Sequence, residues 1–172
     1  MKTLQPIFII RHPVFRIPSL YISFARTTAI RPGDEDWVAL SNLRSQRLIF
    51  DYFKNHTDKV PIVVDGDDVV WRTEELGKAL GHALDLDSAD FSETWSAVPD
   101  EESSKWPIIR IFLETIDAST GVERGSAGRP EVDVEVACQK WAEMYGADVA
   151  KALKGTVEES LPHYEYMKQF AI

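Results

Sequence analysis

The feature that most constrains the fold is a short apolar run, Ile7–Ile10, which ends at Arg11. A continuous apolar run of this kind is typical of a strand buried in a parallel sheet. Pro13 follows and suits the first turn of a helix, and Ser19 lies on the early turns of that helix. The sequence therefore predicts a guanidinium and a hydroxyl where a buried strand meets a helix. That placement suits a phosphate or another anion.

A second apolar run, 61–65 (PIVVD), predicts another buried strand, bounded by Pro and by Gly66. Between the two strands we expect one long helix from about Glu35 to Asn55, buried on two faces. The order strand, helix, strand implies a parallel pair joined by a right-handed crossover. The predicted fold class is therefore α/β, helix-rich with a small parallel sheet.

The rest of the chain is predicted to be mostly helical. One short helix opens at Thr73 and stops near Gly81, and another runs from Pro107 to about Ala118. Two more helical pieces form the C-terminal part, separated by a glycine. The length of 172 residues fits one domain, so we treat residues 1–172 as a single domain.

Charge and composition limit the partners. The net charge of −9 argues against a nucleic-acid partner. No apolar run approaches the roughly 18 residues of a membrane span, so we expect no membrane partner. The single cysteine, Cys138, fits a reducing compartment and a cytoplasmic location. No two histidines have metal-ligand spacing, and Asp65, Asp67 and Asp68 fit a capped, solvated turn better than a Mg²⁺ site, so no metal is expected.

An apolar strand followed by Arg11, Pro13, Ser19 and Tyr21 resembles a segment of the sulfotransferase family. That segment holds the 3′-phosphate of PAPS, the sulfuryl donor, and the resemblance implies that Arg11 and Ser19 contact this phosphate. Most of the remaining chain is similar in layout to a sulfotransferase-like P-loop group common in fungi. The structural alternatives are a salt bridge for Arg11 and a hydroxyl bonded to its own helix for Ser19.

A second segment has a weaker resemblance to the same family. The family closes over the 3′-phosphate with a loop of the form Arg-Lys-Gly-x-x-Gly, and residues 123–128 (ERGSAG) keep both glycines at that spacing. The resemblance implies that Arg124 and Gly125 are further nucleotide ligands. Glu123 stands where the family has Arg, which replaces a positive charge by a negative one.

The family's phosphosulfate-binding loop is not found in this sequence. No segment has the form Gly-x-x-x-x-Gly-Lys-[ST], and that loop and the family's catalytic His would both lie before Met1. We therefore expect a domain that lacks the first strand and the P-loop, and no required cofactor. PAPS or adenosine 3′,5′-bisphosphate is the nucleotide that the remaining segment would take.

The loss of that first strand would leave an edge of Ile7–Ile10 open. An apolar open edge promotes association. We therefore expect a homodimer that covers the edge, a rearranged helix that fills the gap, or a separate partner.

Three functions remain open. The first is a sulfotransferase-like enzyme repurposed for chemistry without PAPS, such as cyclisation, isomerisation or hydrolysis of a small, largely apolar specialised metabolite. Arg11 would orient an anionic or carbonyl group and His12 would move a proton. Four aromatic residues would line the substrate pocket: Tyr21, Trp95, Trp106 and Phe112. Core packing for the tryptophans and a supporting hydrogen bond for His12 are the plainer alternatives.

The second function is a non-catalytic relative that binds a nucleotide or a protein partner. The third is a sulfotransferase completed by a segment outside this sequence. Binding of adenosine 3′,5′-bisphosphate separates the second from the first, and sulfuryl transfer by the purified chain alone would establish the third.

Overall fold

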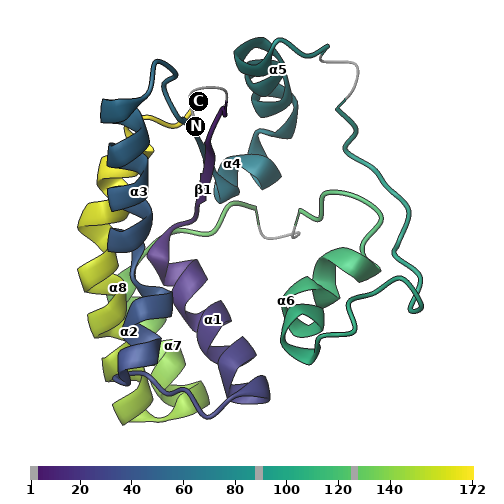
Figure 1. Ribbon diagram of the computed structural model, residues 1–172. Coiled ribbons are helices and arrows are strands. Elements are labelled where there is room, and N and C mark those ends of the chain that lie inside the picture. Colours follow the sequence, from purple (N-terminus) through teal and green to yellow (C-terminus); the bar gives the residue numbers. More distant parts are fainter. Residues whose placement is uncertain (1–3, 88–90, 125–127) are drawn as a thin grey trace.

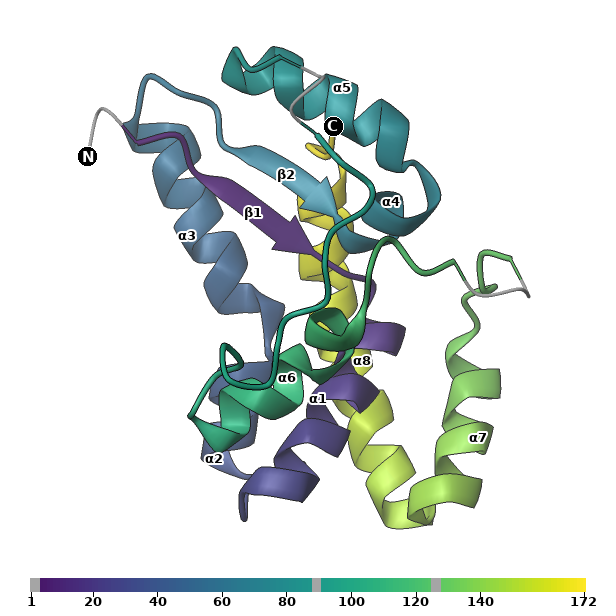
Figure 2. The ribbon, with the colours of Figure 1, turned by 90° about the vertical axis from the view of Figure 1, so that its right-hand side faces the viewer.

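The computed structural model describes residues 4–87, 91–124 and 128–172 of the chain (Figure 1). Two strands, β1 (Ile7–Ile10) and β2 (Ile62–Asp65), pair in parallel, with Ile7 beside Ile62 and Ile10 beside Asp65. Figure 2 shows the two arrows side by side and pointing the same way. The other named elements are helices, which confirms the prediction of a helix-rich α/β fold with a small parallel sheet.

The strand β1 is only half buried, so the prediction of a fully buried strand is wrong. Phe8 and Ile10 face the core, whereas Ile7 and Ile9 are 46% and 65% exposed. On the face that contains Ile7 and Ile9, the helix α5 (Thr73–Leu84) packs against β2 and leaves β1 uncovered. There Leu76 of α5 joins a cluster with Ile62 and Val64 of β2.

The two outer edges of the sheet differ. Beside β2, Ala171 bridges to Val63, and the Ile172 N–H donates to the Val63 carbonyl at 3.1 Å. Beside β1, the Gln46 side chain donates to the Ile9 carbonyl at 2.8 Å. The C-terminus therefore covers the edge of β2, and within the described residues no strand covers the edge of β1.

The predicted helix from Glu35 to Asn55 is two helices, α2 (Glu35–Ser41) and α3 (Leu43–His56). Asn42 separates them because its backbone is extended (φ −77°, ψ 127°) and its side chain accepts from the Arg44 N–H at 2.7 Å. The expected burial on two faces is also wrong, since only Leu43 and Phe50 of α3 are buried.

The chain leaves β2 through a short helix, α4 (Gly66–Trp71), which the sequence did not predict. Asp65 begins it by accepting from the Asp67 N–H at 3.1 Å. The next helix, α5, starts at Thr73 as predicted but continues past Gly81 to Leu84.

The C-terminal helices agree with the sequence. α7 (Val134–Tyr145) and α8 (Ala147–Lys168) are separated at Gly146, whose φ of 90° ends the first. With α1 (Pro13–Thr27) they enclose one core cluster, and α8 also packs against β1, β2 and α3 in a second. In the described part of the chain, no helix has the length and apolar character needed to cross a bilayer.

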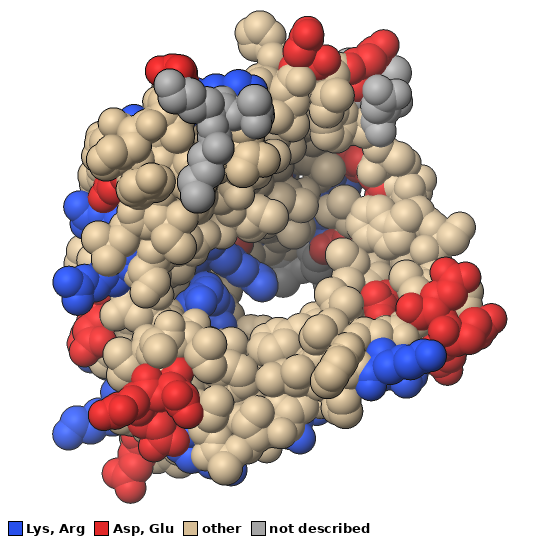
Figure 3. Space-filling view, in the orientation of Figure 1, with Lys and Arg blue, Asp and Glu red and all other residues tan. Residues whose placement is uncertain are grey.

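The helix α6 (Pro107–Ala118) has the bounds that the sequence predicts, but it stands apart from the rest of the chain (Figure 1). None of its residues is buried, and it meets α1 through Phe112 on Phe24 and through an ion pair between Arg26 and Glu114. In space-filling view an opening separates this arm from the body of the molecule (Figure 3).

Candidate functional site

Arg11 lies at the junction that the sequence predicts, directly between β1 and α1. Its side chain is exposed, and within residues 4–87, 91–124 and 128–172 no hydrogen bond or ion pair binds its guanidinium. Its nearest ring is Phe15, whose centroid is 5.8 Å from Cζ. The charge of Arg11 is therefore available to a ligand.

A cavity of about 490 Å³ lies between α1 and α7 and contains Arg11 and Ser19 together. Ser19 is exposed, and its hydroxyl has no hydrogen-bond partner in the described part of the chain. Lys140 of α7 lines the same cavity and has no ion pair with a described residue. Figure 3 shows Lys and Arg side chains beside the opening that separates α6 from the body of the molecule, on the side where β1 meets α1. The cavity thus offers two cations and a hydroxyl.

The rest of the cavity wall is apolar and acidic. Val14 and Ile22 of α1 and Trp141 of α7 line the cavity. Of the two acidic residues that line it, Asp133 is used as the cap of α7, because its Oδ1 accepts from the Glu135 and Val136 N–H groups at 2.8 and 3.0 Å. The cavity fits a small ligand with an anionic group and an apolar or aromatic body.

His12 serves as the N-cap of α1. Its Nδ1 accepts from the Val14 N–H at 3.2 Å, which assigns the proton of the neutral ring to Nε2. Burial lowers the pKa of His12 below its ordinary value, the nearby Asp67 carboxylate opposes that shift, and Lys168 adds to it. His12 is therefore a neutral group that can offer an N–H from Nε2. It is not among the residues that line the Arg11 cavity.

A polar cluster, formed by the buried Asp65 and Tyr164 and the exposed Lys168, lies next to His12. The Tyr164 hydroxyl donates to Asp65 Oδ2 at 2.6 Å, and the Lys168 ammonium donates to that hydroxyl at 2.9 Å and lies 3.4 Å from the carboxylate. Burial, with the hydrogen bond to Asp65, raises the pKa of Tyr164, so the phenol stays protonated as a donor. The Tyr164 ring meets the His12 ring edge-on at 4.9 Å.

The sequence missed this cluster. It placed Asp65 in a capped, solvated turn; the cap is confirmed, but the carboxylate is fully buried. The available signal was an acidic residue at the last position of a buried strand, since a buried carboxylate requires donors. Tyr164 and Lys168 are four residues apart on α8 and supply them.

Gly66 keeps the ends of the two strands close together. A Cβ at this position would lie 3.3 Å from the Ile10 carbonyl oxygen and 3.6 Å from the Arg11 side chain. The close approach brings the start of α1, with Arg11 and His12, next to the Asp65 cluster.

The four aromatic residues expected around Arg11 lie elsewhere, and none lines its cavity. The Tyr21 ring packs against the Tyr145 ring, with 5.1 Å between the ring centroids, and of the two only Tyr145 lines the cavity. Phe112 packs on Phe24, the Trp95 indole donates to the Ser119 hydroxyl at 3.1 Å, and Trp106 is 71% exposed.

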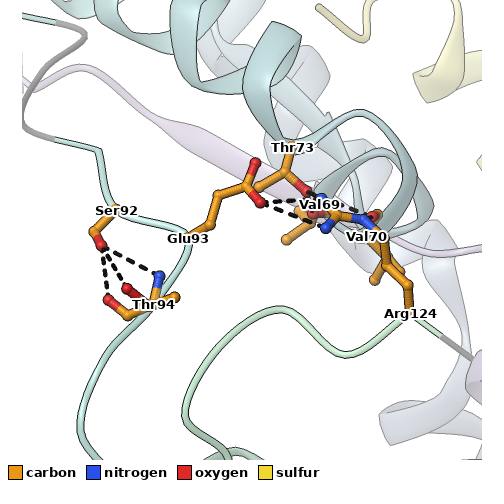
Figure 4. A network of polar contacts seen from close by, with 7 residues as sticks. All are labelled: Val69, Val70, Thr73, Ser92, Glu93, Thr94 and Arg124. Atoms are coloured by element: carbon orange, nitrogen blue, oxygen red, sulfur yellow. Dashed lines mark hydrogen bonds and ion pairs between the residues drawn. The ribbon is translucent and has the colours of Figure 1, made fainter.

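Arg124 is bound within the fold (Figure 4). Its guanidinium donates to the Val70 carbonyl at 2.7 Å and to the Thr73 hydroxyl at 2.6 Å, and lies 3.3 Å from Glu93. It ties the joint between α4 and α5 to the segment around Glu93. Gly125, the other expected nucleotide ligand in this loop, lies outside the described residues.

Comparison with known proteins indicates a sulfotransferase-like relationship. Two fungal proteins match: Sulfotransferase ppzF of Metarhizium majus (strain ARSEF 297), 25% identical, and Sulfotransferase ppzF of Metarhizium rileyi (strain RCEF 4871), 23% identical. Each alignment spans 185 residues and includes 98% of this chain but 53% of the relative. The chain therefore spans about half the length of the curated relatives it matches. No family model and no solved structure matches it.

Proposed function

We propose that this chain is a sulfotransferase-like protein whose cavity between α1 and α7 binds an anionic ligand through Arg11. One observation supports this above all: the Arg11 guanidinium has no hydrogen-bond or ion-pair partner among the described residues and shares a cavity of about 490 Å³ with Ser19. A guanidinium that no carboxylate neutralises is well suited to a phosphate, which it can bind through two N–H groups.

The ligand that we propose first is a nucleotide with the chemistry of adenosine 3′,5′-bisphosphate. The similarity to two proteins named sulfotransferases supports this choice, as does the order Arg11, Pro13, Ser19. Arg11 and Ser19 would hold the phosphate, Lys140 would add charge from α7, and Trp141 would face the base or ribose.

Binding calorimetry with adenosine 3′,5′-bisphosphate tests this proposal. We expect saturable binding that falls at least about tenfold in Arg11→Gln, because a charge-assisted pair contributes more than 1.4 kcal/mol. Arg44→Gln is the control: Arg44 is also exposed but does not line the cavity. No binding by the wild-type chain, or equal loss in both variants, would reject the nucleotide.

An enzyme that acts without PAPS on a small, largely apolar metabolite is the second candidate. The apolar wall formed by Val14, Ile22 and Trp141 favours it, because the cavity would hold an apolar body next to the charge of Arg11. His12 could take part only through Nε2, since Nδ1 caps α1. This proposal requires that turnover of a candidate substrate fall in both Arg11→Gln and His12→Asn; an unchanged rate in either variant would remove it.

We also propose that a second copy of the chain pairs with the outer edge of β1. The edge is apolar, lacks the charged side chains that discourage pairing, and offers the same surface to a symmetry mate. Sedimentation velocity at rising protein concentration should detect a dimer. A monomer at every concentration would contradict the proposal.

A further inference from the structure

A second cavity, of about 610 Å³, lies against the sheet face that β1 leaves uncovered. Ile7, Ile9 and Val64 form its floor, Leu80 of α5 forms one side, and Phe91 forms another. Of the predicted site residues that the structure describes, none lines it. Its volume falls within the range of roughly 300–1,000 Å³ that holds small molecules.

The hydroxyl groups at the rim of this cavity are already bonded within the fold (Figure 4). The Thr73 hydroxyl donates to the Val69 carbonyl at 2.7 Å and accepts from Arg124 at 2.6 Å. The Ser92 hydroxyl donates to the Thr94 carbonyl at 2.7 Å and accepts from the Thr94 N–H at 3.2 Å. Neither hydroxyl needs a ligand to satisfy it.

The charged residues at the rim are paired as well. Lys78 lies 2.5 Å from Glu74, and Glu93 lies 3.3 Å from Arg124. Among the described residues that line this cavity, a ligand charge would meet no unpaired opposite charge, in contrast to the Arg11 cavity. The chemistry of the site therefore selects against charged ligands.

The wall that contains Phe91 and Glu93 is fixed by more than one contact. The Val122 N–H donates to the Glu93 carbonyl at 3.1 Å, and Arg124 binds the Glu93 carboxylate. Gly121 is required for this approach, because a Cβ there would lie 2.9 Å from the Glu93 carbonyl oxygen. The cavity is thus bounded by positioned elements on several sides and is not simply an exposed strand face.

We propose that this cavity is a binding site for a neutral, apolar small molecule, separate from the Arg11 site. Ile9 is 65% exposed on the floor, so an apolar ligand would cover surface that the fold leaves in water. A charged molecule of the same size would gain no unpaired opposite charge from the described residues of the rim.

Fluorescence titration with the neutral probe N-phenyl-1-naphthylamine tests the site. We expect saturable binding at one site per chain, and displacement by 1-decanol at least about tenfold better than by decanoate, because no described residue of the rim offers an unpaired cation. In Ile9→Arg the affinity should fall at least about tenfold, since a charge replaces the apolar floor. Leu48→Arg is the matched control, because Leu48 is 57% exposed on α3 and does not line the cavity.

A second variant keeps the test decisive if Ile9→Arg does not fold. Val69→Trp places bulk in the cavity from α4, where Val69 is 38% exposed, and should also weaken probe binding. The proposal is overturned by the absence of saturable binding, by equal loss in Leu48→Arg, or by decanoate competing as well as 1-decanol. It is also overturned if probe affinity falls as a dimer forms in sedimentation, because a second copy would then occupy the cavity.

Discussion

The substitution Tyr164→Phe isolates the buried hydrogen bond between Tyr164 and Asp65. It keeps the ring that packs edge-on against His12 and removes the hydroxyl that donates to Asp65 at 2.6 Å. Asp65 is fully buried, so water cannot replace the lost donor. A hydrogen bond to a charged group contributes about 1.5–3 kcal/mol. We therefore expect the free energy of unfolding to fall by about 2 kcal/mol.

Urea denaturation at neutral pH, followed by far-ultraviolet circular dichroism, measures this loss. Tyr166→Phe is the control on the same helix, because its hydroxyl donates to Asp51 at 2.7 Å and the Asp51 side chain is 27% exposed. Water can solvate Asp51, so we expect a loss below about 1 kcal/mol. Equal losses in the two variants, or a change of less than about 0.5 kcal/mol in Tyr164→Phe, would refute the reasoning.

Three further predictions follow from local geometry. Asn42→Ala should cost about 1 kcal/mol of stability in urea, since it removes the cap of α3, and no change would contradict that role. Gly121→Ala should destabilise by about 1–3 kcal/mol through its contact with the Glu93 carbonyl, whereas Gly155→Ala in α8, where a Cβ meets nothing, should stabilise by about 0.5–1 kcal/mol. Because burial lowers the pKa of His12, the unfolded chain binds more protons once the pH falls below 6.5, and stability should fall through that window. His12→Asn keeps a capping side chain and should flatten this part of the pH profile; an unchanged profile would show that His12 does not contribute.

Local patterns predicted the elements whose causes are local. The apolar run Ile7–Ile10 is a strand, Pro107 opens a helix with the expected end at Ala118, and Gly146 separates the last two helices. At Pro107 and at Gly146 a residue with a restricted or unusual backbone fixes the boundary. Asn42 was missed because the apolar spacing continues through it, and its capping bond outweighs that spacing.

Properties that depend on distant neighbours could not be predicted. The exposure of Ile9 depends on how many helices cover that face of the sheet. The residues around Ile9 do not encode this. The burial of Asp65 depends on Tyr164, 99 positions away. The strand–helix junction predicted that Arg11 and Ser19 would lie together, whereas the wall opposite them, including Lys140, comes from α7.

The most direct test is a crystal structure of the chain with adenosine 3′,5′-bisphosphate. We predict a phosphate in the cavity between α1 and α7, within hydrogen-bonding distance of the Arg11 guanidinium and the Ser19 hydroxyl. A nucleotide bound elsewhere, or an Arg11 side chain locked to a carboxylate with the cavity closed, would contradict the proposal that this junction binds anions.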